Sequence, residues 1–142
     1  MKKPTSAEVR GMEAERRLIT LARSLRQGHE WLGRIRKAGT KHDKAGVDVI
    51  IYAYTITGGE ERVLPIALQV KSSRAGVRHF YAKHQFALAT GVIPIVVNDG
   101  RSDKVILRDI LRAISKGIFS KGRAERVAAF LDAVRHDTHV TH

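Results

Sequence analysis

Two apolar segments of the chain carry three polar residues whose types and spacing could do chemistry. Asp48 is the one acid in residues 46–57, while Gln69 and Lys71 lie in residues 62–72. Both segments are rich in apolar and β-branched residues, which predicts strands, and Gly58-Gly59 between them predicts a two-residue hairpin turn. Such a turn pairs Asp48 with Gln69 and places Lys71 two residues further along the same face. An acid, an amide and an amine are therefore expected to converge at one end of the hairpin.

The opposite face of the hairpin supports this register. Its predicted cross-strand pairs are all apolar: Val47 with Val70, Val49 with Leu68, Ile51 with Ile66, and Ala53 with Leu64. A slip of one residue would place polar side chains on this face, which is expected to be the core side. A simpler interpretation of the polar face is a salt bridge between Asp48 and Lys71 at a sheet edge, with Gln69 as an ordinary polar residue.

A further candidate, Glu15, lies in the first predicted helix, residues 6–26, for which Ser6 is the expected N-cap. At about 100° per residue, one arc of this helix is apolar and comprises Met12, Leu18, Ile19, Ala22 and Leu25. Glu15 falls in the middle of that arc, whereas Glu13 falls on the opposite, arginine-rich side. A carboxylate on a buried face is costly unless a cation meets it, and Lys71, an arginine or a bound metal would serve.

The other predicted elements complete one mixed α/β domain. They are a strand at 31–37, a helix at 78–90 closed by Gly91, a strand at 92–98, a turn at 98–100, a helix within 103–116 and a last helix at 120–135. A brief strand at 105–107 could precede the helix within 103–116. Residues 137–142 are expected to be a loose tail, and no linker or repeat divides the 142 residues.

The composition favours a nucleic-acid partner. Lys and Arg number 26 against 14 Asp and Glu, which gives a formal charge of +12. A surplus of this size on one small domain attracts polyanions. There is no cysteine, no secretory signal pattern and no apolar run near the roughly 20 residues that a membrane helix needs. We therefore expect a cytoplasmic protein with no membrane partner.

Two short patterns resemble those of a known superfamily. Gly46-Val47-Asp48 followed by Gln69-Val70-Lys71-Ser72 resembles the D…(E/Q)xK signature of PD-(D/E)XK nucleases. Gly11-Met12-Glu13-Ala14-Glu15-Arg16 resembles the G-x-x-x-E-R start of archaeal Holliday-junction resolvases and Mrr-like restriction enzymes. The resemblance covers roughly residues 11–98 and implies an α/β restriction-endonuclease-like core with a central mixed sheet of about four to five strands flanked by helices. Val47 stands where the family has proline, and Gln69 where most relatives have a second acid.

The resemblance also implies a reaction and a set of roles. The chain would hydrolyse DNA with Mg²⁺ or Mn²⁺, as hard cations that take oxygen ligands. Asp48, the side-chain oxygen of Gln69, the carbonyl of Val70 and Glu15 would hold the metal, and the metal would activate a water. Lys71 would orient or deprotonate that water and stabilise the developing charge. Glu15, Asp48, Gln69 and Lys71 are thus the predicted catalytic residues.

Basic residues on two segments are the predicted contacts to DNA, either duplex or branched. Residues 34–44 are read as a basic loop that clamps phosphates, and residues 73–84 follow the signature. The predicted contacts are Arg34, Arg36, Lys37, Lys41, Ser73, Arg74, Arg78, Lys83 and His84. A homodimer is implied only by the resemblance, because cutting two strands usually takes two sites. A junction resolvase, a restriction or homing-type endonuclease and a catalytically silent nucleic-acid-binding protein remain as alternatives.

Overall fold

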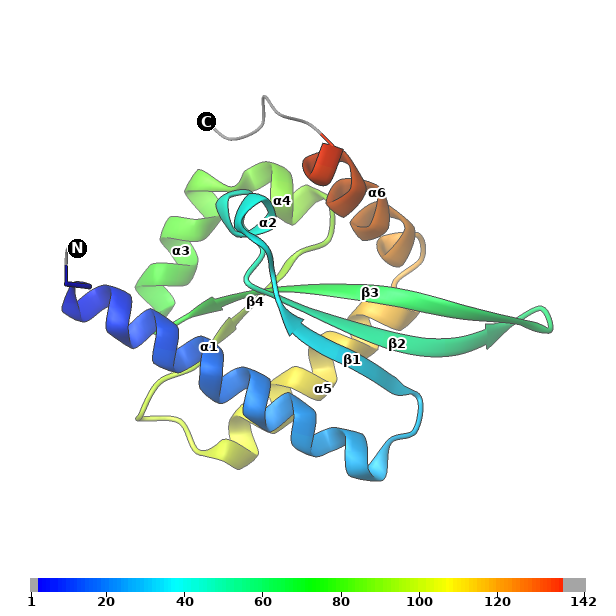
Figure 1. Cartoon of the computed structure of the whole chain (residues 1–142), viewed down its shortest axis with the longest axis horizontal. Coiled ribbons are helices and arrows are strands. Elements are labelled where there is room, and N and C mark those ends of the chain that lie inside the picture. The colour runs from blue at the N-terminus through cyan, green and yellow to red at the C-terminus, as the bar shows by residue number, and fades with distance from the viewer. Residues whose placement is uncertain (1–2, 137–142) are drawn as a thin grey trace.

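A four-stranded sheet lies between two groups of helices in the computed structural model, which describes residues 3–136 (Figure 1). The strands are β1 (Leu32–Lys37), β2 (Val49–Thr57), β3 (Glu60–Lys71) and β4 (Ile93–Val96). The helices are α1 (Ser6–Ser24), α2 (Thr40–Lys44), α3 (Arg74–Lys83), α4 (Gln85–Ala89), α5 (Asp103–Phe119) and α6 (Arg123–His136), with a 3-10 turn, η1 (Leu25–Gly28), after α1. The predicted tail at 137–142 lies outside the described residues. No helix within residues 3–136 is long and apolar enough to cross a membrane.

The sheet is mixed, as predicted. Its strand order is β1-β2-β3-β4, with antiparallel pairing between β1 and β2 and between β2 and β3, and parallel pairing between β3 and β4. Helices α1 and α5 cover one face of this sheet, and α3, α4 and α6 cover the other. Each face has its own apolar core, so both faces of the central strands β2 and β3 are buried. The predicted α/β class with about four strands is confirmed.

The predicted hairpin register is confirmed from Val49 onward. Val49 pairs with Leu68 and Ile51 with Ile66, and these residues join the core beneath α1 and α5. The prediction for Val47 is wrong, because Val47 packs in the opposite core. The reason is that the ladder begins only at Val49. One residue earlier, the amide of Asp48 donates to the Leu68 carbonyl at 2.9 Å, one step out of the regular pairing, which turns Val47 to the other face.

Several predicted helix boundaries are shifted. Thr5, not Ser6, caps α1, since its hydroxyl accepts from the amide of Glu8 at 3.1 Å. Helix α3 begins four residues before the prediction, because the Ser73 hydroxyl accepts from the amide of Gly76 and starts a helix at Arg74. The predicted helix then divides at His84 into α3 and α4. The alternative strand at 105–107 is wrong, since these residues lie in α5.

The basic segment 34–44 is not the loop that its composition suggested. Its first part is strand β1 and its last part is the short helix α2, joined at Gly39. The amide of Ala38 donates to the Asp48 carbonyl at 2.8 Å, which holds the end of this strand against the start of β2. The Val47 amide in turn donates to the His42 carbonyl at 2.9 Å. These bonds fix α2 beside the residues that precede β2.

Candidate functional site

Three carboxylates meet where β2 begins. Glu15 comes from α1, Asp43 from α2, and Asp48 from the residue just before β2. One oxygen from each lies within 4.8 Å of the others, which is close enough for a single metal ion to bind all three. We call these three residues the acidic cluster. The structure brings together the predicted Glu15 and Asp48 and adds Asp43, which was not predicted.

Asp48 is held rigidly at the centre of the acidic cluster. Its side chain is 6% exposed, and its Oδ2 accepts a hydrogen bond from the amide of Val70 at 2.8 Å. Its own amide and carbonyl are bonded to β3 and to the end of β1. Asp48 is therefore fixed by hydrogen bonds to β3 and to the end of β1, which is the rigid support that a metal ligand needs.

The acidic cluster lacks positive charge. Burial, followed by a hydrogen bond with the Asp43 carboxyl, raises the pKa of Asp48 to about 8, against a lowering by the Val70 amide. Burial also raises the pKa of Glu15, which the ammonium of Lys37 partly opposes. Lys37 lies 3.7 Å from Glu15 but is mostly exposed, so it balances the buried charge weakly. A divalent cation among the three carboxylates would favour their ionised forms.

Gln69 supplies an independent sign of a ligand. Its side chain is 6% exposed, and its Oε1 is buried with no hydrogen-bond donor among residues 3–136. A buried carbonyl oxygen without a partner costs on the order of 1–3 kcal/mol. Gln69 immediately precedes Val70, whose amide holds Asp48, so this oxygen belongs to the same end of β3. An all-oxygen set of carboxylates and one amide suits Mg²⁺ or Mn²⁺ rather than zinc.

Lys71 lies apart from the carboxylates. Its ammonium sits 6.0 Å from the centroid of the Phe80 ring, and it makes no ion pair with any carboxylate within residues 3–136. The interpretation of Lys71 and Asp48 as a salt bridge is therefore wrong. Lys71 is also not the partner of Glu15, because Lys37 forms the ion pair with Glu15. The catalytic role of Lys71 and the metal-binding role of the Val70 carbonyl stay predictions.

The apolar arc of α1 is narrower than predicted. Met12 is 50% exposed, whereas Ala14, Leu18 and Ala22 are buried against the sheet. Glu15 follows Ala14 at the border of this buried stripe, with its side chain 18% exposed. Glu15 therefore lies near Asp48 in the acidic cluster, but at the border of the buried stripe and not in the middle of the apolar arc, where it was predicted.

Basic residues on β1 and α2 line a groove at the β1 edge of the sheet, which we call the β1–α2 groove. The groove contains the predicted Arg34, Arg36 and Lys41 and also Thr40, His42, Tyr52 and Arg135, with no acid among its lining residues. The Arg36 guanidinium lies 5.7 Å from the centroid of the Tyr52 ring and donates to its hydroxyl at 3.0 Å, and Lys41 donates to the Arg135 carbonyl at 3.2 Å. Lys37, predicted with this group, instead faces Glu15.

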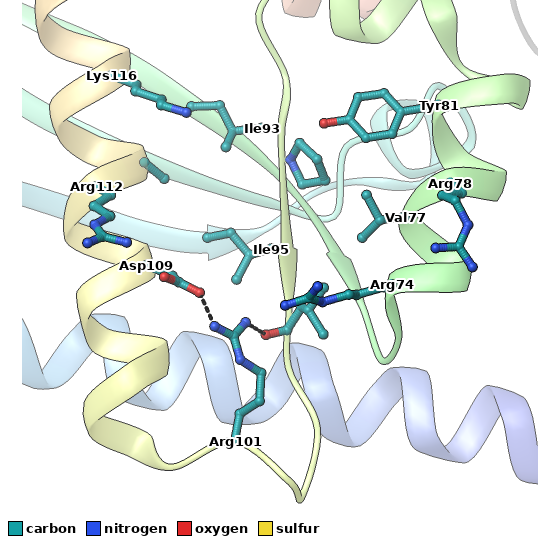
Figure 2. A pocket seen from close by; sticks show the side chains of 13 residues that line it. Arg74, Val77, Arg78, Tyr81, Ile93, Ile95, Arg101, Asp109, Arg112 and Lys116 are labelled. Atoms are coloured by element: carbon teal, nitrogen blue, oxygen red, sulfur yellow. Dashed lines mark hydrogen bonds and ion pairs between the residues drawn. The ribbon is translucent and has the colours of Figure 1, made fainter.

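The predicted contacts after the signature are divided among several roles. Ser73 caps α3, and Lys83 is exposed on the same helix. Arg74 and Arg78 line a second groove, between α3 and α5 (Figure 2).

His84 packs against Phe80 at 5.1 Å between ring centroids, and burial, followed by the charges of Lys83 and Lys71, lowers its pKa. Gly46 lies against the same rings. It has a φ of +101°, and a Cβ there would come within 3.0 Å of Phe80 and 3.2 Å of His84. Only glycine fits this turn into Asp48.

Comparison of the chain with protein-family models, curated proteins and solved structures finds no match. The functional conclusion therefore depends on the acidic cluster, Gln69 and the basic grooves. Sequence reasoning missed Asp43 because it was grouped with its basic neighbours. A signal was present, since Asp43 is the one acid in residues 34–44 and lies five residues before Asp48.

Proposed function

We propose that this chain is a metal-dependent endonuclease that hydrolyses phosphodiester bonds of DNA in the cytoplasm. The observation that carries the proposal is the acidic cluster, together with the unsatisfied Oε1 of Gln69 at the same end of β3. Buried carboxylates with a raised pKa and an amide oxygen without a donor are explained together by one divalent cation. The net charge of +12 supplies the attraction for a polyanionic substrate.

Asp48, Asp43 and Glu15 would hold Mg²⁺ or Mn²⁺, with the side-chain oxygen of Gln69 and the carbonyl of Val70 as further ligands. When bound, the metal supplies a water of lowered pKa and neutralises charge on the phosphate. The Val70 amide keeps the Asp48 carboxylate oriented toward the cluster. The acids themselves repel a phosphate, so the two basic grooves must hold the DNA backbone in place.

Lys71 is proposed to act on the substrate rather than on the carboxylates. It makes no ion pair within residues 3–136, so its ammonium is free to meet an anion. It lies two residues beyond Gln69 on β3, and a substrate phosphate placed between them would bring it into contact with developing negative charge.

The narrower proposal is a Holliday-junction resolvase acting as a homodimer, in line with the resemblance of residues 11–16 and 46–48. A restriction or homing-type endonuclease would use the same site on a different substrate. One observation favours a catalytically silent nucleic-acid-binding protein instead. Gln69 is neutral where most relatives have an acid, so the metal would be bound with one negative charge fewer.

Cleavage assays separate these functions. The full chain is incubated with supercoiled plasmid, linear duplex and a four-way junction, each with Mg²⁺, Mn²⁺ or EDTA. We expect cleavage with either metal, none in EDTA, and none by Asp48→Asn with either metal, while Asp99→Asn, an exposed acid in the turn after β4, stays active. Binding to all three substrates without metal-dependent cleavage by the wild type would overturn the nuclease and favour the silent binder.

A further inference from the structure

A second groove crosses the open edge of the sheet, away from the acidic cluster. It lies between α3 and α5 above β4, with a volume of about 460 Å³, within the usual range of small-ligand pockets (Figure 2). Its floor is apolar and includes Val77, Ile93 and Ile95. Its two walls are basic, with Arg74 and Arg78 on α3 and Arg112 and Lys116 on α5. We call it the α3–α5 groove.

The charges of the two walls are not neutralised within the groove. Asp109 is the one acid that lines it, and Asp109 is already paired with Arg101. None of the four wall cations forms an ion pair within residues 3–136. Four cations on facing helices, about an apolar floor, require a ligand that carries several negative charges and also apolar surface.

The exposed edge of β4 offers few backbone groups to an added peptide strand. The Val97 amide donates to the Lys71 carbonyl at 2.8 Å, so the backbone groups of alternate residues Pro94 and Val96 point away from β3. Pro94 has no N–H to offer, and the Val96 carbonyl already accepts from Arg101 at 2.8 Å. On these residues only the Val96 N–H and the Pro94 carbonyl are left for an added strand, which is one donor and one acceptor. Recognition in this groove therefore depends mainly on side chains.

We propose that the α3–α5 groove binds a single-stranded segment of nucleic acid. Its phosphates would lie against Arg74 and Arg78 on one wall and Arg112 and Lys116 on the other, and its bases and sugars would cover the apolar floor. Tyr81 on α3, 46% exposed at the rim, offers a ring on which one base stacks. A duplex keeps the faces of its bases inside its own stack and presents only base edges, sugars and phosphates, so it could not stack a base on this ring.

This inference rests on the proposed function for its partner, DNA, and narrows its substrate. Arg74 is the first residue of α3 and follows Lys71 by three residues, so the groove begins close to the end of β3 that carries Gln69. A DNA strand that leaves the acidic cluster could continue into the groove only if it were not base-paired. The favoured substrate class is then DNA in which an unpaired segment adjoins the cleaved bond, rather than an uninterrupted duplex.

Fluorescence anisotropy tests the groove without cleavage. The full chain in EDTA is titrated with labelled oligothymidine and with a labelled duplex of equal length, over a series of salt concentrations. The test variant is Arg112→Ala with Lys116→Ala; the matched control is Lys104→Ala with Arg108→Ala, which removes the same charge from exposed positions of α5 outside the groove. Because single strands lose about 0.7 units of log–log salt slope per phosphate contact, we expect the test variant to flatten that slope by about 1.4.

The control should leave the slope for oligothymidine nearly unchanged, and neither variant should alter duplex binding. Tyr81→Ala should weaken oligothymidine binding roughly 5- to 150-fold, since stacking is lost, whereas Tyr81→Phe keeps the ring and should bind like the wild type. Equal losses of affinity in the test and control variants, or equal losses for duplex and single strand, would overturn the assignment of this groove to a single-stranded segment.

Plasmid cleavage with Mg²⁺ is measured in parallel, so that the two proposals can fail separately. Cleavage by the wild type without a groove effect on oligothymidine overturns this inference alone. Groove-dependent binding of oligothymidine without any cleavage supports the groove and overturns the nuclease.

Discussion

Replacing Asp48 by asparagine should make the metal-free protein more stable while making it inactive. Asparagine has nearly the shape of aspartate, and its Oδ1 can still accept from the Val70 amide that now holds the carboxylate at 2.8 Å. What the substitution removes is a negative charge buried beside Glu15 and Asp43. For most acidic residues of a folded protein, removing the charge lowers the free energy of unfolding. An increase in Asp48→Asn would therefore identify an unfavourable buried charge.

The magnitude follows from the pKa of Asp48, which is raised from 3.8 to about 8. A group whose pKa is higher in the folded state favours folding fully below its unfolded pKa, and that contribution is lost as the pH rises through the folded value. The free energy of unfolding of the wild type should therefore fall between about pH 4 and pH 8 in the absence of metal. At about 1.4 kcal/mol per pH unit, the loss by pH 7 is on the order of 4 kcal/mol.

The assay is urea unfolding in EDTA at pH 4, 7 and 9, repeated at pH 7 and 9 with Mg²⁺. Asp48→Asn should match the wild type at pH 4 within about 1 kcal/mol and exceed it at pH 7 by up to about 4 kcal/mol. Saturating Mg²⁺ should stabilise the wild type, by about 2.7 kcal/mol at a hundredfold excess over Kd, and leave the variant unchanged. Asp99→Asn, an exposed control, should stay within about 0.5 kcal/mol of the wild type throughout.

Lower stability of Asp48→Asn than of the wild type at pH 7 in EDTA would refute this reasoning. It would mean that the ionised carboxylate is already satisfied by the protein, as in a structural hydrogen-bond network. An equal response of both proteins to Mg²⁺ would place the metal elsewhere.

Three further predictions concern the remaining site residues. Gln69→Glu should fold and bind Mg²⁺ more tightly by calorimetry, because it restores an acid; a variant that unfolds would instead mark Gln69 as structural. Glu15→Gln should cut the cleavage rate by orders of magnitude. Its thermal midpoint should barely move, because the partner that it loses, Lys37, is 62% exposed. Glu13→Gln should change neither quantity, and a normal cleavage rate for Glu15→Gln would remove Glu15 from the site. Replacing Arg74 and Arg78 together by alanine should flatten the log–log salt slope of single-strand binding by about 1.4 units and leave that of duplex binding nearly unchanged; an unchanged slope for the single strand would place the DNA on the β1–α2 groove.

The sequence predicted the hairpin well because a buried strand pair leaves little freedom. A shift of one residue would have placed Asp48 or Gln69 among Ile51 and Leu68, so the apolar pattern alone selects the observed register. The pattern could not show where the ladder begins. That depends on the bond from the Asp48 amide to Leu68 and on the turn at Gly46, both of which are tertiary features.

Asp43 shows the other limit of sequence reasoning. Helix α2 has only five residues, too few to be stable on its own or to give a clear periodic pattern. It exists because its carbonyls and side chains are held by its neighbours, including the His42 ring, which lies 2.8 Å from the Leu131 carbonyl of α6. A third carboxylate therefore reaches the acidic cluster through contacts with a helix almost ninety residues away, which no local pattern contains.

The acidic cluster repels a phosphate, whereas the basic grooves attract it. Under the proposed function, this difference would couple metal binding to DNA binding. Without a cation, Asp48 and its neighbours repel any phosphate that the wall residues of the α3–α5 groove and of the β1–α2 groove bring near. A bound metal turns that repulsion into attraction at the same point. If the metal raises the affinity for DNA by some factor, DNA must raise the affinity for the metal by the same factor. Under the proposed function, a metal site weakened by the neutral Gln69 would be compensated, because oxygens of a substrate held by the grooves could serve as further ligands of the cation.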